Sequence, residues 1–499
     1  MLKMKYMKFI AVGIIALISL SCSDFLDKNP LDQISSETFW QNEQEAKMAL
    51  TGVYSRLRAF TFTHKDTEFD IMAGDVCGNQ GHSIINIAQG NIEPNSGGIV
   101  SYIYSNCYAG IGSCNFFLEN IEKTPISTET LNVYKGEVCF LRALFYFTLT
   151  EHYGGVPLYT SPVTIEEAKV KQSTKEEVVN QILLDLDFAI ANLPDKTYSS
   201  GHAVKGSAMT LKAKVLLHNQ KWQESAEIAD RIIRDGKFSL YNDFRNLFLS
   251  SGQKNNPEII FSTRYLNPDI YSDLDIRWSW HAVVEPRQEL VDAYECADGK
   301  PIDISPLYDP SNWRLNRDPR LLMTIKAFED SVYNSAGQKV GFNYNAVSAT
   351  GYSPVKYCNW DALPINYSTQ SDQDWILLRY ADVLLMYAEA RNEVSGPDAS
   401  VYDAINKVRD RVNMPQLPTG LSKDEMRKRI RNERRVEFAL EGIRWGDIKR
   451  WKTAETYIPT LVDPGGKRRQ FDPSKHYLLP FPQSEMDVND NLVQNPGYN

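Results

Sequence analysis

The chain of 499 residues has few cysteines and histidines and lacks the signatures of the common enzyme classes. It contains seven cysteines and seven histidines, and no two cysteines have C-x-x-C spacing, which argues against a zinc or thiol-redox centre. The H-E-x-x-H, G-x-S-x-G, P-loop and EF-hand patterns are all missing. A glycoside hydrolase, however, needs only two carboxylates at a set distance in space, and the chain has 63 acidic residues. A hydrolase without a local motif therefore stays open.

A long hydrophobic run occurs only once, at the N-terminus. Three lysines precede the apolar residues 9–18, a run too short to span a bilayer and typical of a secretory signal. Cys22 follows a serine at the end of this region, where bacterial lipoproteins are cleaved and acylated. We predict a signal peptide over 1–21, a lipid on Cys22, and an acidic leader over 22–35. The alternative is an ordinary cleaved signal with an incidental cysteine.

The remaining six cysteines are expected to be thiols in the apolar core. Two of them lie seven positions apart on one predicted helix, about 10 Å at 1.5 Å per residue, which is too far for a disulfide within that helix. A disulfide between distant elements stays open in an oxidising compartment. The six residues are Cys77, Cys107, Cys114, Cys139, Cys296 and Cys358.

The charge balance argues against nucleic acid as a partner. Removal of residues 1–21 takes away three lysines and no acidic residue, so the formal net charge moves from -9 to -12. The basic stretch 426–452 interleaves acidic and apolar residues with its arginines and lysines. We interpret this stretch as a partly buried pair of helices.

Helical periodicity dominates the rest of the chain and predicts an all-α fold with tetratricopeptide-like helix pairs. Small residues in 204–236 mark where two antiparallel helices approach closely, in a unit of about 34 residues; a plain helical hairpin is the alternative. These small residues are Ala208, Ala213, Ser225, Ala226 and Ala229. The predicted helices cover 45–60, capped by Ser36 or Thr38, and 100–123, 128–152, 174–193, 204–236, 374–394 and 399–412.

The predicted division separates an N-terminal helical part from a C-terminal part. The first covers 36–254, and the second covers 255–499 with a loop-rich segment at 255–370, helices at 374–452 and an irregular C-terminal tail. Irregular segments of this length inside a compact protein are usually functional.

Charged residues interrupt otherwise apolar helical runs. Arg142 lies in one run, and Arg379, Asp382 and Glu389 lie in another. Because buried charges must be paired, we favour a structural ion network over a polar functional site. The expected partners are Arg434, Arg435, Glu437 and Arg444.

Aromatic and polar residues of the loops form the candidate site. Aromatic faces pack against the apolar face of a sugar ring, while amide, carboxylate and guanidinium groups bind its hydroxyls. Trp278 and Trp280 would share a face in an extended strand. Tyr265 and Trp313 belong to the same aromatic group. The predicted ligand-binding residues are Trp278, Trp280, Tyr271, His281 and Trp360, with Asp75, Asn79 and His82 from a glycine-rich loop.

Each of these residues also has a structural interpretation. The aromatics would pin the irregular region to the helices, and the glycine-rich loop would be an ordinary solvated turn. Asp269, Asp273 and Asp275 form an acidic cluster with calcium-ligand chemistry, for which we favour a solvated loop. No cofactor or metal site is predicted.

Several stretches resemble the SusD/RagB-like nutrient-binding lipoproteins of the Bacteroidetes outer membrane. They include SCSDFLDKNP, FWQNEQEAKMALTGVY, GEVCFLRALFYFTLTEHYGGVPL, ILLDLDFAIANLP, GSAMTLKAKVLLHNQKW, LLRYADVLLMYAEARNEV, RNERRVEFALEGIRWGDIKRW and LLPFPQSE with QNPGY. The resemblance implies a helical, lipid-anchored protein exposed on the cell surface, which binds a nutrient oligosaccharide without cleaving it. It also implies delivery of that ligand to a SusC-like TonB-dependent transporter. The alternatives are a peptide-binding member of the family and a lipid-anchored glycoside hydrolase.

Overall fold

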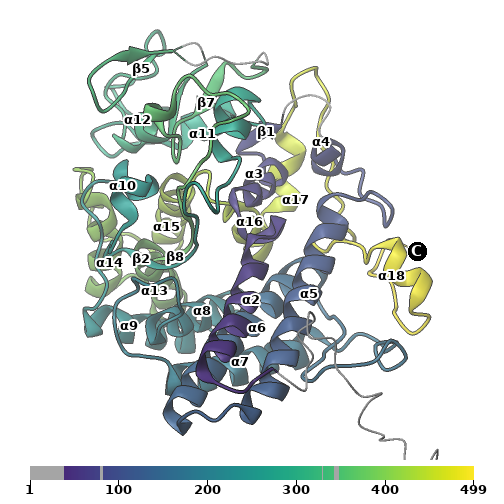
Figure 1. Ribbon diagram of the computed structural model, residues 1–499. Coiled ribbons are helices and arrows are strands. Elements are labelled where there is room, and N and C mark those ends of the chain that lie inside the picture. Colours follow the sequence, from purple (N-terminus) through teal and green to yellow (C-terminus); the bar gives the residue numbers. More distant parts are fainter. Residues whose placement is uncertain (1–38, 79–82, 329, 342–347, 499) are drawn as a thin grey trace, which may run out of the picture.

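The computed structural model describes residues 39–78, 83–328, 330–341 and 348–498. The predicted signal peptide, Cys22 and the acidic leader lie outside these residues. Long helices form a lower body, and short strands and helices form an upper lobe (Figure 1). The last short helix, α18, lies beside the N-terminal end of α5, on the side of the body where the chain ends. No helix of the described segments combines the length and apolarity needed to cross a bilayer.

Both halves of the sequence contribute helices to the body. They are α2 (Glu43–Tyr54), α5 (Ile99–Asn120), α6 (Thr128–Tyr153), α7 (Lys175–Asn192), α8 (Lys205–His218), α9 (Trp222–Asp235), α13 (Tyr380–Ser395), α14 (Ala399–Asp410), α15 (Lys423–Glu437) and α16 (Arg444–Arg450). The shorter α-helices are α3 (Glu68–Ala73), α4 (Ser83–Ala88), α10 (Ser250–Gln253), α11 (Gln288–Ala293), α12 (Arg320–Thr324), α17 (Ala454–Tyr457) and α18 (Gln483–Val488).

Short antiparallel strand pairs occur between the helices of the described chain. β1 (Val76–Gly78) pairs with β3 (Val284–Pro286), and β2 (Ile259–Thr263) pairs with β8 (Trp375–Arg379). In the upper lobe β4 (Ile325–Ala327) pairs with β7 (Tyr352–Pro354), and β5 (Val332–Tyr333) pairs with β6 (Lys339–Val340). None of these pairs grows into a larger sheet in the described residues, so the predicted helical fold class is confirmed.

The helix pair predicted over 204–236 is present as α8 and α9. All five small residues named above are buried between packed helices. The Ser225 hydroxyl donates a hydrogen bond of 2.9 Å to the Ala213 carbonyl across the pair. Trp222 begins α9, immediately after the turn between the two helices. Close backbone approach at small residues is what lets such pairs stack.

The caps of the helices follow the expected chemistry, with one correction. Thr174 and Glu177 form a capping box at the start of α7. The cap of α2 is Asn42, whose side-chain oxygen accepts from the Glu45 amide at 3.0 Å. The prediction of Ser36 or Thr38 as the cap of this helix is therefore wrong, and both residues lie outside the described segments. Asparagine is as good an N-cap as serine, and here it is the residue adjacent to the helix.

The helix predicted over 374–394 begins later than its hydrophobic pattern suggests. Residues Trp375–Arg379 form strand β8 against β2, and α13 starts at Tyr380. Both strands are rich in β-branched or large apolar residues, and their backbone groups are satisfied across the pair. Figure 1 shows the two strands between the helices of the lower body and the upper lobe.

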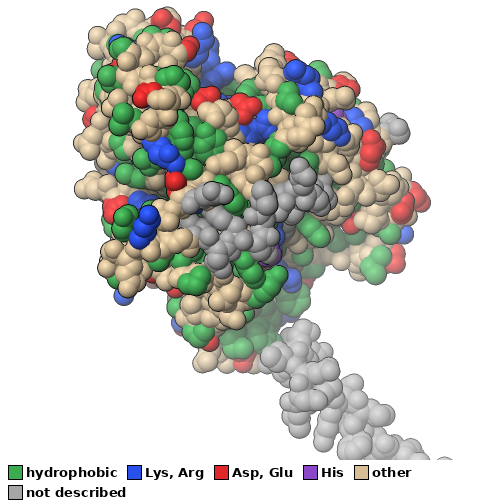
Figure 2. Space-filling view, turned by 90° about the horizontal axis from the view of Figure 1, so that it is seen from above, with side chains coloured by type: hydrophobic (Ala, Val, Ile, Leu, Met, Phe, Trp, Pro, Cys, Tyr) green, Lys and Arg blue, Asp and Glu red, His purple; other side chains and the backbone are tan. Residues whose placement is uncertain are grey.

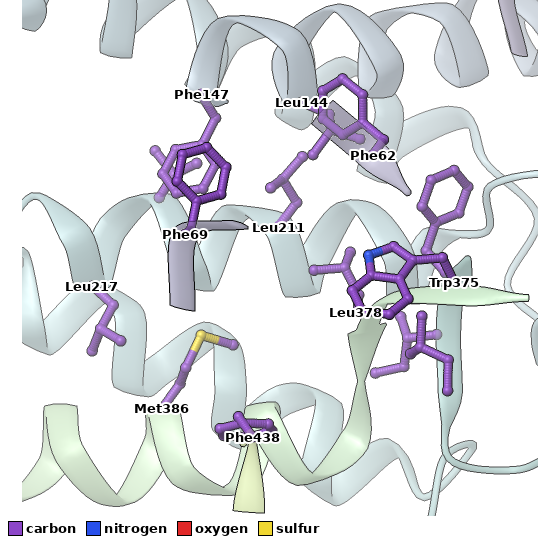
Figure 3. Close-up of a cluster of buried hydrophobic side chains, with 14 of the residues drawn as sticks. Phe62, Phe69, Leu144, Phe147, Leu211, Leu217, Trp375, Leu378, Met386 and Phe438 are labelled. Carbon is purple, nitrogen blue, oxygen red and sulfur yellow. The ribbon is translucent and has the colours of Figure 1, made fainter. Parts of the chain in front are cut away.

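The hydrophobic core runs across the predicted division at residue 255. Phe62, Leu144 and Leu211 come from the first part, while Trp375 and Leu378 come from the second, and all belong to one buried cluster. Figure 3 shows Leu144 and Leu211 on two helices near Phe62, with Trp375 and Leu378 of β8 next to them. The division itself stays a prediction.

The predicted ion network is confirmed and holds the second half together. Arg379 pairs with Glu437 at 2.6 Å, and Arg434 pairs with Asp382 at 2.8 Å and approaches Glu389 at 3.9 Å. Arg142 forms a separate bidentate pair with Asp185, at 2.6 and 2.8 Å. These pairs are almost fully buried, so each satisfies charges that would be costly alone.

The six cysteines of the described chain are buried free thiols, as predicted. Cys107 and Cys114 both lie on α5. Burial raises the pKa of the Cys77 thiol to about 11 and that of Cys358 to about 12. The Cys77 and Cys358 thiols are therefore protonated and unreactive at neutral pH.

Candidate ligand-binding site

Three aromatic rings meet at the end of a short helical turn and form the candidate site. The turn Ile276–Trp280 has π-helical hydrogen bonding, and the His281 amide donates to the Ile276 carbonyl at 2.9 Å. The Trp280 ring lies 5.2 Å from the His281 ring and 4.3 Å from the Tyr367 ring, measured between centroids. Tyr367 is 75% exposed. We call Trp280, His281 and Tyr367 the aromatic cluster.

The geometry of the cluster offers two differently oriented faces. Trp280 and His281 are nearly parallel, with 28° between their planes, whereas Tyr367 stands at 70° to Trp280. His281 and Tyr367 are 5.9 Å apart. An angled pair of rings, one half-buried and one exposed, can contact two sides of a partly apolar ligand while leaving its polar edge in water.

Buried hydrogen bonds fix the loop that carries Tyr367 against the segment before the turn. Ser272 and Ser371 form an antiparallel bridge, with the Ser272 amide donating at 2.8 Å. The buried Asp275 carboxylate accepts from the Ser371 hydroxyl at 2.8 Å and from the Gln373 amide at 3.0 Å. Asp275 also accepts from the Asn359 backbone amide at 2.9 Å. The rings are therefore held on a rigid support, which lowers the ordering cost of binding.

Trp278 is a core residue, which corrects one predicted ligand contact. Its side chain is fully buried, and its ring lies 6.1 Å from Tyr357 and 6.3 Å from Trp375. The expected extended conformation is absent because 276–280 is a helical turn. Residues two apart in a helix point to different sides. Trp278 therefore anchors the turn, while Trp280 reaches the surface.

Asp75 is also placed in the interior and not in a solvated loop. It is 2% exposed and pairs with Arg435 at 2.5 Å and with Arg444 at 3.7 Å. Asp75 thus completes the ion network that was predicted for these two arginines. A buried carboxylate with two arginine partners has no free surface for a ligand.

The other predicted residues have different surroundings. Tyr271 is 52% exposed next to the Ser272 bridge. Trp360 is half-buried, with the Arg245 guanidinium 4.5 Å from its ring. Asn79 and His82 lie outside the described residues. Gly78, the last residue of β1, pairs with Val284, three positions after His281.

The acidic cluster predicted near the turn is divided between separate partners. Asp273 pairs with His64 at 2.9 Å, and this contact, with nearby Lys65 and Arg277, holds the pKa of its carboxyl below the usual value despite burial. Asp275 serves the loop support described above, and burial raises its pKa. Asp269 is exposed, whereas Asp273 and Asp275 bind different partners, so the three carboxylates are not held on one ion, and Asp275 is not solvated as expected. No group of potential metal ligands occurs in the described residues.

Tyr367 is the residue that sequence reasoning missed. It lies in a polar turn of the loop-rich segment, where the Ser368 amide donates to the Asn366 side chain at 2.7 Å. A single tyrosine among small polar residues in a loop was a usable signal of exposure. Its contact with Trp280, 87 positions away, had no signal in the sequence.

Comparison with known proteins covers nearly the whole chain. A model of the SusD family matches residues 257–498, and a model described as starch-binding associating with outer membrane matches residues 24–217. SusD-like protein P2 of Formosa agariphila is 28% identical over 98% of this chain and 100% of its own length.

The chain belongs to the SusD/RagB-like family.

Solved structures agree with this assignment over the full fold. A SusD-like carbohydrate-binding protein from Bacteroides fragilis has a TM-score of 0.80 and 28% identity, covering 91% of this SusD-like chain and 100% of the other. A laminarin-binding SusD-like protein has a TM-score of 0.71 and 26% identity, covering 92% and 100%. Glycan binding, association with the outer membrane and partnership with a SusC-type protein are thus properties of the family.

Proposed function

We propose that this SusD-like protein binds a nutrient oligosaccharide at the aromatic cluster and delivers it to a SusC-like TonB-dependent transporter without cleaving it. The angled pair of half-buried Trp280 and exposed Tyr367 is the observation that carries the proposal. Stacking on two rings suits the apolar faces of sugar units, and His281 adds a polar group beside them. Tyr271 lies on the adjoining segment and would extend the contact along a longer glycan.

The anchoring proposal rests on the sequence. A lipid on Cys22, followed by the leader over 22–35, would hold the protein on the cell surface beside the transporter. A binding site tethered next to a pore raises the local ligand concentration, so modest affinity suffices for delivery.

The burial and ion pairing of the acidic residues near the aromatic cluster support a function without catalysis. Glu68 is almost fully buried and pairs with Arg277 at 3.2 Å, and burial raises its pKa to about 7. Asp273 is engaged by His64. A glycoside hydrolase needs two carboxyl groups that both reach the substrate. Glu68 has no access to a ligand at the surface.

The test is calorimetry of the mature body, residue 23 onward, against a panel of polysaccharides and peptide digests, with product analysis of each mixture. Trp280→Ala and Tyr367→Ala should each weaken glycan binding about tenfold or more, because a central aromatic contact contributes a large share of affinity. Tyr333→Ala is the matched control, since Tyr333 is 63% exposed on β5 and is not one of the three residues of the cluster. New reducing ends would overturn the non-catalytic proposal, and unchanged affinity in both variants would overturn the site.

A peptide ligand is the second candidate, favoured by an apolar groove elsewhere on the body. The groove has a volume of about 710 Å³ between α2 and α5, with Met48 and Phe116 half-exposed at its edges. A Cβ atom added at Gly52 or Gly112 would meet nothing within 4 Å, so the groove floor is open there. Gly112→Leu should block peptide binding in this groove and leave glycan binding at the aromatic cluster unchanged.

A further inference from the structure

A cavity on the lower body carries an excess of positive charge in a protein that is acidic overall. It has a volume of about 520 Å³, within the range of small-molecule sites. The C-terminal end of α6, the start of α7, the turn between α8 and α9, the end of α16 and the tail at 473–478 form its walls. These elements are distinct from those that carry the aromatic cluster. We call it the lysine cavity, after Lys175, Lys449, Lys452 and Lys475.

The charges of the lysine cavity are only partly balanced by the described residues. Glu151 approaches Lys175 at 3.5 Å, and Glu93 approaches Lys475 at 3.1 Å. Lys452 is exposed and stands 3.7 Å from the centre of the Tyr477 ring. Arg450, which also lines the cavity, is already paired with Glu389 and Asp447. Among the described residues that line the cavity, four lysines thus accompany one carboxylate, that of Glu151, in a chain of net charge -9. Asp472 and Glu455 lie outside the lining, near Lys475 and Tyr477.

Two buried polar groups in the wall are incompletely satisfied. Lys449 is 7% exposed, and its ammonium donates to the Glu151 backbone carbonyl, which carries no formal charge. Burial lowers the pKa of Lys449 to about 8. The side chain of His218 is 6% exposed, with Nδ1 at 2.5 Å from Glu151 and Nε2 buried without a hydrogen-bond partner among the described residues. A buried polar atom without a partner marks a place where a ligand group or water belongs.

The geometry points to a second ligand site: we propose that the lysine cavity binds a monosaccharide-sized organic anion carrying a carboxylate or a sulfate group. The lysine ammonium groups would donate charge-assisted hydrogen bonds to the anion, which are the strong class of hydrogen bond in proteins. Tyr477 and Leu478 supply an apolar wall for the body of the ligand. The volume exceeds what an inorganic anion needs and matches a small organic molecule.

The test is calorimetry with glucuronate, glucose 6-sulfate, glucose and inorganic sulfate as probes. Glucuronate or glucose 6-sulfate should bind at least about tenfold more tightly than glucose, since one charge-assisted contact accounts for such a factor. Binding should weaken as salt is raised, because the cavity is open to solvent and its charges are screened. Equal binding of glucose would overturn charge recognition, and inorganic sulfate binding as tightly as the organic anions would overturn the organic ligand.

Two sets of variants keep the proposal falsifiable. Lys449→Gln removes the buried ammonium, and the double variant K452Q/K475Q removes two charges from more accessible positions without touching Lys449. The matched control is K47Q/K407Q, which removes two lysines from exposed helical pairs with Glu43 and Asp403. K452Q/K475Q should weaken anion binding at least about fivefold, whereas the control, with the same change in net charge, should bind as wild type. Wild-type affinity in both cavity variants, or an equal loss in the control, would overturn the site.

Discussion

Glu437 is the centre of the buried ion network, and its charge is the most informative one to remove. One carboxylate oxygen lies 2.6 Å from Arg379 and 2.5 Å from Arg411, and the other lies 2.9 Å from Arg320 and 2.6 Å from Arg411. The side chain has no exposed surface, and the three guanidinium groups hold the pKa of its carboxyl well below the usual value. Glu437→Gln keeps the shape but presents an amide N–H to arginine donors.

The expected cost is about 3–5 kcal/mol, the range for breaking a buried pair while its partner charge stays buried. Arg320 and Arg379 retain other carboxylates, Asp318 and Glu441, so the loss should stay within this range. Urea unfolding followed by far-UV circular dichroism measures it as a lower midpoint.

The control for Glu437→Gln is Asp403→Asn, which removes an exposed helical pair with Lys407. It should change the free energy of unfolding by at most about 0.5 kcal/mol. A loss below about 1 kcal/mol in Glu437→Gln would refute the reasoning, because it would mean that the three arginines find compensation without this charge.

Three further predictions concern packing and pH. Trp278→Ala should lower stability by about 3–5 kcal/mol in thermal or urea unfolding while the folded protein keeps its glycan affinity; loss of affinity without loss of stability would contradict its core role. Gly110→Ala should destabilise by about 1–3 kcal/mol, since the added Cβ would lie 2.6 Å from the Phe145 ring, whereas Gly112→Ala on the same helix should be neutral or stabilising; equal effects would contradict the packing. Burial lowers the pKa of Lys356 to about 8 from its ordinary value of 10.5, so above pH 8 the unfolded state holds a proton that the folded state has released. The stability of wild type relative to Lys356→Met should therefore rise by about 1–2 kcal/mol between pH 8 and 9.5, and a flat difference in urea midpoints would show that the lysine stays charged.

The helices were predictable because their signals are local. Thr174 and Glu177 mark the start of α7 within four residues, and the small residues of α8 and α9 repeat at helical spacing. Strand β8 was not separable from α13, since a run of apolar residues has no period of its own. Its partner strand ends 112 positions earlier, at Thr263.

The candidate site was harder to predict because burial depends on distant residues. Trp278 and Trp280 have the same chemistry and the same neighbours in sequence. Only the packing of Tyr357 and Trp375 against Trp278 decides which one is buried. The glycines near Asp75 predict an exposed turn. Asp75 is instead buried against Arg435, which lies 360 positions further along the chain, so its burial has no local signal. Local patterns predicted the segment that carries the site and could not select the exposed residues within it.

The burial of the free thiols determines how the protein responds to an oxidising environment. Because the six cysteines of the described chain are buried and form no disulfide, the fold requires no oxidant to form, and burial shields the thiols from oxidants in solution. The stability of the described fold should therefore not depend on whether its surroundings are oxidising or reducing. A cysteine introduced at Ser368, beside Tyr367, would be exposed, whereas the six cysteines of the described chain are buried. A thiol-reactive dye would therefore label this position selectively and could report whether a ligand occupies the aromatic cluster.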